Sequence, residues 1–205
     1  MKSKNQDLFV KLNLDKKDNP HLIFSRTNYF FKNYDLFIKS LLSNNLQNEE
    51  VINKIFQISK PVHYATFISA HDLQKYKNFF LKHEYQLNQN FNSVIIQRYL
   101  RTKYQDNHIS AKIQKMKHCS NKEIEIFYIE NGLDTEEIEN ENKLVRHFAI
   151  EIDQNNYQKL ERLIIANDFQ HVIGGSNDFE KSTINYYEKI FDNNDRIRLE
   201  LFVKN

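Results

Sequence analysis

One arrangement of residues occurs twice along this chain, and it restricts the folds open to the chain more than any other feature. His147 begins a strand-like apolar run, and Glu200 lies in a second such run near the C-terminus. Upstream, His63 and Glu125 occupy the same two places. Between each histidine and its glutamate the pattern predicts one helix and two further strands. The sequence therefore predicts an α+β fold of two tandem βαβββ modules, whose histidine and glutamate strands are 63–69, 123–129, 147–152 and 196–202.

Alternation along a strand indicates which side chains share a face. In the last strand Arg198 and Glu200 lie on one face, opposite a face of aliphatic residues that should pack on a helix. In the first strand of that module His147 lies opposite the apolar set, so His147 and Glu200 should point to the same side. The upstream module gives His63 and Glu125 the same placement. Imidazole and carboxylate groups are the ligands expected of a catalytic Fe, Zn, Ni or Mn ion.

The remaining segments complete the expected organisation. Residues 1–60 contain two amphipathic stretches, within 28–42 and 48–56, and are predicted to form an N-terminal helical extension that covers a sheet edge, packs a dimer or closes over a ligand. The first module should then run from 61 to 130, with a helix at 71–82 and strands at 93–100 and 109–116. Residues 131–144 carry many acids and are predicted to be a solvated linker. The second module should run from 145 to 205, with a helix at 156–166 and strands at 146–152, 169–173, 182–191 and 195–203.

Composition excludes several classes of protein. The net charge is +2 with pI near 8.4, and no basic stripe with interleaved aromatics is present, so a nucleic-acid partner is not expected. One cysteine, Cys119, cannot form an internal disulfide and fits a reducing compartment. No 18 apolar residues run together and no apolar signal segment follows Met1. A cytoplasmic protein without a membrane anchor is therefore predicted.

Residues 61–205 resemble the vicinal oxygen chelate superfamily, which includes glyoxalase I, extradiol dioxygenases and the fosfomycin- and bleomycin-resistance proteins. The resemblance is carried by the tandem βαβββ pattern, by the His-aromatic-Ala start of each first strand, and by the final Arg-Ile-Arg-Leu-Glu-Leu-Phe strand. Family members usually have a Pro-Asp-Gly type of turn before the last strand, where this chain has residues 192–195, Asp-Asn-Asn-Asp. The resemblance implies that the modules pair into a half-open mixed β-barrel with a divalent metal ion inside.

The resemblance also implies roles for particular residues. His63, His147 and Glu200 match the two-histidine, one-carboxylate ligand set of the dioxygenase branch, which leaves positions open for substrate. Glu125 would complete the two-histidine, two-glutamate set of the glyoxalase I branch, where a carboxylate also moves a proton. A two-residue hairpin loop at 193–194 would place Tyr187 across from Glu200, as a donor to a developing oxyanion. His171 would be an acid or base if its strand turns it inward.

Each of these residues has a structural interpretation as well. Glu200 could pair with Arg198 at the surface, Glu125 could lie on a solvated edge, and Tyr187 could simply pack. Cys119 follows His118 in a predicted loop, where an incidental exposed thiol is the favoured interpretation over a metal ligand or nucleophile.

Two functions follow from different classes of protein. One is a metal-dependent enzyme, dioxygenase-like or glyoxalase-like, acting on a small oxygenated molecule in the cup between the modules. The other is a metal-free module of the bleomycin-resistance type that sequesters an aromatic or cationic ligand. The ligand set His63, His147 and Glu200 favours the enzyme. The identity of the metal, the substrate and the reaction stay open, as does whether the modules pair within one chain or between two chains of a homodimer.

Overall fold

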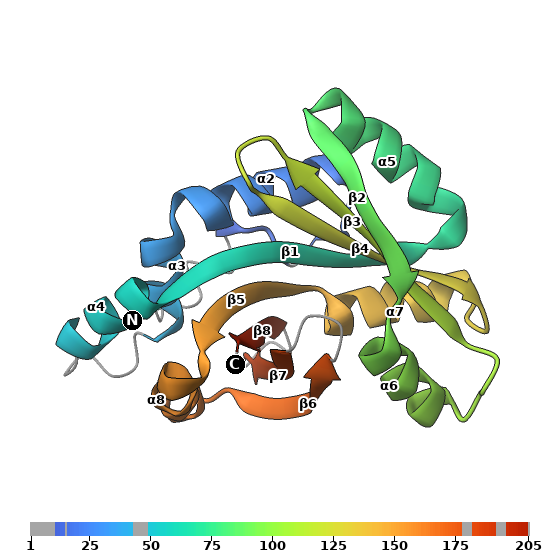
Figure 1. Cartoon of the computed structure of the whole chain (residues 1–205). Helices are drawn as coiled ribbons and strands as arrows, with labels where there is room; N and C mark the ends of the chain where they lie inside the picture. Colours follow the sequence, from blue (N-terminus) through green and yellow to red (C-terminus); the bar gives the residue numbers. More distant parts are fainter. Residues whose placement is uncertain (1–10, 15, 43–48, 178–181, 192–195, 205) are drawn as a thin grey trace. The chain divides into compact units, whose positions relative to one another are not determined.

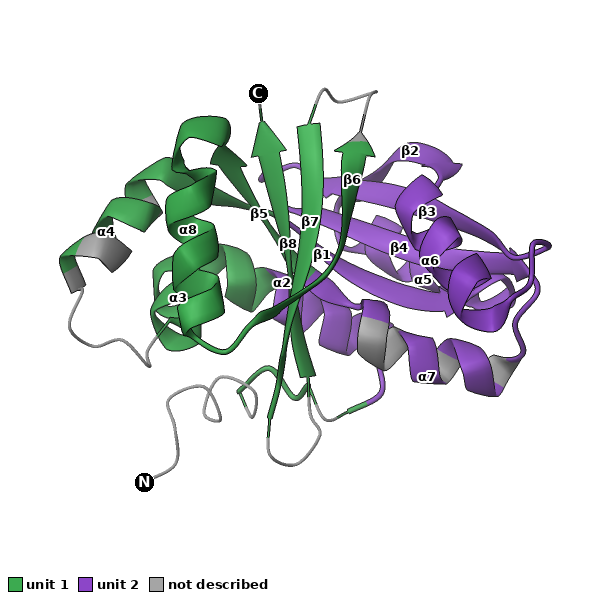
Figure 2. Ribbon diagram, turned by 90° about the horizontal axis from the view of Figure 1, so that it is seen from below, with its two compact units in different colours: residues 1–16, 28–62, 148–205 green, residues 17–27, 63–147 purple. Residues whose placement is uncertain are grey.

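The computed structural model describes residues 11–14, 16–42, 49–177, 182–191 and 196–204, and they form a mixed α+β protein (Figure 1). The chain divides into two compact units, coloured separately in Figure 2. Unit 1 comprises residues 1–16, 28–62 and 148–205, and unit 2 comprises residues 17–27 and 63–147. None of the helices among the described residues is long and apolar enough to span a membrane.

The described part of the chain holds its helices and strands in the following order. The N-terminal part holds α2 (Pro20–Lys32), α3 (Tyr34–Leu41) and α4 (Glu49–Ile58). The next elements are β1 (Ser59–Ser69), the short 3-10 helix η2 (Ala70–Asp72), α5 (Leu73–Lys82), β2 (Tyr85–Asn92), α6 (Val94–Tyr104), β3 (Ser110–His118), β4 (Glu123–Asn131) and α7 (Thr135–Val145). The last are β5 (His147–Asp153), α8 (Gln154–Ala166), β6 (Gln170–Asn177), β7 (Ser182–Ile190) and β8 (Arg196–Lys204).

The strands of the two units follow the same topology. In one the order across the sheet is β2-β3-β4-β1, and in the other it is β6-β7-β8-β5. In each unit the strand that comes last in the sequence is parallel to the strand that comes first: β4 pairs with β1, and β8 pairs with β5. The other neighbouring strands are antiparallel. Each histidine strand is therefore hydrogen-bonded to its glutamate strand, as the repeated pattern requires. The pairing of modules into a half-open barrel and the module boundaries stay predictions.

Unit 1 has an aromatic core between its N-terminal helices and its sheet. Phe30 of α2 and Phe37 of α3 both pack on Phe148 of β5, with ring centroids 5.1 and 4.7 Å from it. All three side chains are buried. Phe148 lies on the apolar face that the sequence assigned to helix packing, so the N-terminal helices here cover a sheet face. Helices thus form within residues 20–58, and Asn33 interrupts the stretch predicted as one helix, while the extension bounds 1–60 stay a prediction.

Helix α8 covers the same face of unit 1 further along the sheet. Asp153 caps its start by accepting a hydrogen bond from the backbone N–H of Asn156 at 3.0 Å. Leu160 and Ile164, one turn apart, are its buried residues, as the helical spacing predicts.

Unit 2 contains a buried ionic network on the helix side of its sheet. The carboxylate of Asp18, which has no exposed surface, accepts hydrogen bonds from Arg26, from Arg146 at 3.3 Å and from the Thr66 hydroxyl at 2.6 Å. Tyr64 lies beside Thr66 on β1 and accepts a hydrogen bond from Arg26 at 3.0 Å. The network attaches residues 17–27 to β1 and leaves His63, one residue earlier on β1, on the opposite face.

Unit 2 has a helix where a strand was predicted, and a strand just before it that was not predicted. Residues 93–100, predicted as a strand, form helix α6, because Ile96 and Leu100 are buried one helical turn apart while Val94 is exposed. The β-branched run at its start is typical of strands and gave the wrong assignment. The second strand of this module is β2, which precedes α6. Tyr85 is its one buried residue, so no apolar alternation indicates a strand there.

The acidic segment also differs from prediction. Instead of a solvated linker it contains helix α7, whose Ile138 and Glu141 are buried. The Glu141 carboxylate accepts a hydrogen bond from the Tyr104 hydroxyl at 2.6 Å and pairs with Lys103. Partners on α6 therefore hold an acidic residue that charge patterning alone assigns to solvent.

Burial of Tyr64 gives the stability of the protein a dependence on alkaline pH. Burial, and next the charge of Asp18, raise the pKa of Tyr64 from 10 to about 12. Because the folded pKa is raised, the contribution is complete below pH 10 and is lost as pH rises towards 12. The free energy of unfolding should fall in this window by about 2 kcal/mol more in the native chain than in Tyr64→Phe. Denaturant titrations between pH 9 and 12, with Tyr99→Phe as the control, measure this; equal slopes for all three proteins would contradict it.

Candidate metal centre

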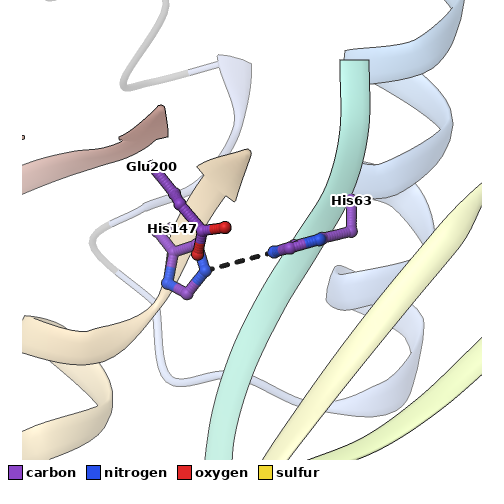
Figure 3. Close-up of side chains that lie close together, drawn as sticks. All are labelled: His63, His147 and Glu200. Atoms are coloured by element: carbon purple, nitrogen blue, oxygen red, sulfur yellow. Dashed lines mark hydrogen bonds between the residues drawn. The ribbon is translucent and has the colours of Figure 1, made fainter. Parts of the chain in front are cut away.

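The two predicted histidine ligands meet within unit 2. His63 comes from β1 and His147 from the first residue of β5, and their side chains are 2% and 1% exposed. Their Nε2 atoms lie 3.3 Å apart, as the dashed line in Figure 3 marks. The ring of Phe127 on β4 packs edge-on against His147, with centroids 5.7 Å apart. Two residues 84 positions apart in sequence are thus buried together, with their rings in an edge-to-face arrangement at 66° and their centroids 5.4 Å apart.

The protonation of His147 follows from its backbone contact. Its Nδ1 lies 2.6 Å from the carbonyl oxygen of Val145. A carbonyl can only accept, so the proton of the neutral ring is on Nδ1 and the lone pair is on Nε2. A ring held in this tautomer by a backbone carbonyl is the arrangement common among metal-ligating histidines.

The separation of the two nitrogens fits a shared divalent ion. Bonds of about 2.0–2.1 Å from a metal to two imidazole nitrogens place those nitrogens about 2.9–3.4 Å apart, for angles from a right angle to a tetrahedral one. The observed 3.3 Å lies within this range. Imidazole nitrogens suit Zn, Fe, Ni or Mn better than Mg or Ca.

Glu125 lies at the other edge of the His63 ring. Its Oε1 is 3.5 Å from Nδ1 of His63, whereas the nitrogen that faces His147 is Nε2. The carboxylate is 4% exposed and pairs with the Lys115 ammonium at 2.9 Å. Lys115 is the cross-strand partner of Glu125 and also lies 3.7 Å from Glu123. The cluster of His63, Glu123 and Glu125, whose ligand atoms lie within 4.8 Å of one another, therefore already contains a cation.

Glu200 lies in unit 1, on β8, and its side chain is 2% exposed. It pairs with Ala149 of β5 on one side and with Tyr186 of β7 on the other. The neighbouring cation on its face, Arg198, donates to Glu188 at 3.1 Å. Glu200 is thus a buried carboxylate in the middle of a sheet, and a solvated surface position is wrong for it.

The pairing predicted between Tyr187 and Glu200 is wrong by one residue. Tyr186 lies opposite Glu200, and Tyr187 lies opposite Leu199 on the helix side. The prediction assumed a two-residue loop at 193–194, which lies outside the described residues. The Tyr187 hydroxyl instead contacts α8, where it meets Tyr157 at 2.7 Å and donates to Glu161 at 2.5 Å. Burial, followed by these bonds to Glu161 and Tyr157, raises the pKa of Tyr187.

His171 shares the face of Tyr187, since the two are directly paired across β6 and β7. It is exposed, and its Nε2 lies 3.4 Å from the Asn185 side-chain oxygen. An acid or base role for His171 would need its side chain to point inward. In β6 the side chain is exposed instead.

Two site residues escaped the sequence prediction. Lys115 lies on the face of β3 that also carries Ile113, and it could have been found from its place opposite Glu125, had the pairing been known. Tyr186 could be found only by counting the loop before β8 correctly. Both depend on strand register, which a single sequence determines poorly where the loop is not a standard turn.

Comparisons with known proteins give matches among solved structures alone. No family model matches the chain, and none of the curated proteins matches it in sequence. Among solved structures, a mutant of 4-hydroxymandelate synthase from Streptomyces coelicolor aligns with 72% of this chain at 7% identity and a TM-score of 0.48. The alignment spans 49% of that synthase, so this chain covers about half of its length.

Two shorter proteins align over most of their length. One is the fosfomycin resistance protein FosX from Listeria monocytogenes, complexed with Mn(II) and a dihydroxypropylphosphonic acid, which aligns with 70% of this chain and 89% of its own, at 15% identity and a TM-score of 0.25. The other is a glyoxalase family protein from Bacillus cereus, which aligns with 69% of this chain and 92% of its own, at 11% identity and a TM-score of 0.27. All three belong to the vicinal oxygen chelate superfamily. Because no TM-score here reaches 0.5, we infer function below from the residues of this chain.

Proposed function

We propose that this chain is a metal-dependent enzyme of the vicinal oxygen chelate type, acting on a small oxygenated molecule bound between its two modules. The ligands of the divalent ion are His63, His147 and Glu200. This proposal rests on two buried imidazole nitrogens, Nε2 of His63 and Nε2 of His147, which lie 3.3 Å apart. On His147, the contact of Nδ1 with the Val145 carbonyl leaves the lone pair on Nε2. The two nitrogens can hydrogen-bond to each other if His63 carries its proton on Nε2, and a divalent ion between them would instead bind the lone pairs of both.

Strand continuity supports Glu200 as the third ligand. His147 precedes Ala149 by two residues in β5, so their side chains share a face. Ala149 is paired in parallel with Glu200, whose side chain is on that same face. In this ligand set the carboxylate contributes one negative charge and the two imidazoles none. Three protein ligands leave coordination positions open for a substrate.

A bound divalent ion would act as a Lewis acid that polarises the oxygen atoms of the substrate. The chain's own residues would orient the substrate and exclude water. Tyr186 lies directly across from Glu200 and, in this proposal, donates its phenol proton to a substrate oxygen. Phe127, which packs edge-on beside His147 within unit 2, would supply an apolar wall.

We assign Glu125 to the orientation of His63. Its carboxylate faces Nδ1, so it can hold the proton there and leave Nε2 for the metal, while Lys115 balances its charge. The ligand set is then two histidines and one glutamate, as in the dioxygenase branch, instead of the four-ligand set.

Glu125→Gln tests this assignment. The variant, prepared with Cys119→Ser so that the thiol does not bind the probe, should still bind one equivalent of Co²⁺, with an affinity about 10–100-fold weaker, as loss of an outer-shell partner of a ligand usually costs. The matched control is Glu130→Gln, which removes the exposed Lys112–Glu130 pair of the same two strands and should leave affinity unchanged. Titration followed by the visible cobalt spectrum gives both quantities. A changed spectrum, with loss of a coordinated oxygen, would make Glu125 a ligand.

The proposed activity is tested by turnover with defined metals. The chain loaded with Fe²⁺, Mn²⁺, Ni²⁺ or Zn²⁺ should act on at least one class among dihydroxyaromatic compounds with O₂, hemithioacetals and epoxides, and chelation should abolish the turnover. If instead aromatic or cationic ligands bind equally well before and after chelation, and no metal supports turnover, the chain is a sequestering protein.

A further inference from the structure

We propose a second metal site on the surface of unit 2, formed by Glu84, His118 and Cys119, which binds Zn²⁺ or a similar borderline-soft divalent ion. It lies where β2 begins and β3 ends and shares no residue with the buried histidine pair. The three side chains offer a carboxylate oxygen, an imidazole nitrogen and a sulfur within 4.8 Å of one another.

The distances between these atoms match the edges of a tetrahedron around zinc. Nε2 of His118 is 3.5 Å from Oε2 of Glu84, and Sγ of Cys119 is 3.8 Å from that oxygen and 3.9 Å from Nε2. Bonds of about 2.0 Å to nitrogen and oxygen and about 2.3 Å to sulfur, at tetrahedral angles, give edges of about 3.3 Å between nitrogen and oxygen and about 3.5 Å to sulfur. Closing around an ion therefore needs shifts of a few tenths of an ångström.

The end of the β2–β3 ladder brings the three residues near one another. Tyr85 of β2 is paired with His118 of β3, and Glu84 and Cys119 are the turn residues that adjoin this last pair. The turn after β3 is closed by a backbone hydrogen bond from His118 to Lys122 at 2.8 Å. The Tyr85 ring packs against the His118 ring with centroids 5.0 Å apart.

The ring of His118 is held by Ser120. Its Nδ1 accepts a hydrogen bond from the backbone N–H of Ser120 at 3.0 Å and lies 2.7 Å from the Ser120 hydroxyl, so the neutral ring carries its proton on Nε2. Binding of a metal ion at Nε2 would displace this proton. On binding, the Cys119 thiol would lose its proton to the buffer and bind as thiolate. Thiolate with imidazole selects Zn, Co or Cu over Mg or Ca, and a water molecule would complete the four positions. A three-residue site open to solvent is expected to bind reversibly.

Cobalt distinguishes this site from the buried one, because only this site contains a thiolate. We expect His147→Ala, kept reduced and titrated with Co²⁺, to develop a near-ultraviolet thiolate-to-cobalt charge-transfer band that saturates at one equivalent and is bleached by Zn²⁺. Adding Cys119→Ser should remove the band. Adding Glu84→Gln or His118→Ala should weaken the affinity by more than the about tenfold loss typical of an outer-shell partner.

The control is Glu130→Gln, an exposed carboxylate on the same unit, which should leave the titration unchanged. Absence of the charge-transfer band would overturn the site. So would a band that Glu84→Gln and His118→Ala leave unchanged, since the thiol would then bind cobalt alone. Neither result bears on the buried site, which His147→Ala has already removed.

Discussion

Replacing Asp18 by alanine is expected to lower the free energy of unfolding by about 3–5 kcal/mol, because it leaves two buried cations without their shared carboxylate. Arg26 and Arg146 are 1% and 8% exposed, and both donate to the same oxygen of Asp18. The hydroxyl of Thr66 loses its acceptor as well. Of the substitutions considered, this one should have the largest effect on folding.

Urea unfolding followed by circular dichroism measures the change. Asp72→Ala is the matched control, since the side chain of Asp72 is 40% exposed and lies 3.6 Å from the exposed His71; it should change stability by no more than about 0.5 kcal/mol. If Asp18→Ala and Asp72→Ala unfold at the same urea concentration, the network does not hold residues 17–27 onto β1.

Replacing Glu200 by glutamine is expected to weaken divalent metal binding by a hundredfold or more without unfolding the chain. Structural zinc sites with four ligands bind with about 10–16 kcal/mol, so one ligand contributes about 3 kcal/mol, which is about a hundredfold in affinity. Glutamine keeps the size of the buried side chain and removes only its charge and one ligating oxygen. Competition with a colorimetric chelator measures the affinity, with Cys119→Ser present in every protein so that only the buried site is counted.

The matched control is Glu151→Gln. Glu151 is the carboxylate of β5 on the face of His147, but it pairs with Lys60 and Lys204, each at 2.9 Å. Its replacement should leave metal affinity within about threefold of the native value, since surface ion pairs contribute little. An equal loss in both variants would show that the charge of this sheet, and no direct bond from Glu200, determines binding.

The sequence was most informative where one face of a strand or helix is apolar. Strands β5, β7 and β8 and helix α8 lie within a few residues of their predicted bounds, because alternation and helical spacing are both strong there. The meeting of His63 with His147 was implied by the resemblance to the vicinal oxygen chelate superfamily. The internal repeat places each histidine at the start of a first strand, but strand periodicity does not say how two modules pair.

The errors have tertiary causes. Strand β2 is mostly exposed and polar, so pairing with β3 makes it a strand where no local pattern does. The helix α7 keeps the acidic Glu141 buried because Tyr104 and Lys103 of α6 bind it. Tyr187 was predicted opposite Glu200, where Tyr186 lies. The predicted register assumed a length for the loop before β8, and no local rule determines that length. None of these partners is visible from the segment that they stabilise.

The central claim is that His63, His147 and Glu200 bind one divalent metal ion, and metal content tests it most directly. Native protein and His147→Ala should both be purified without chelator or added metal and analysed by elemental mass spectrometry, each with Cys119→Ser present so that only the buried site is counted. We predict close to one equivalent of a transition metal in the first protein and a small fraction of that in the second. Equal metal content in the two, or none in either, would contradict the account.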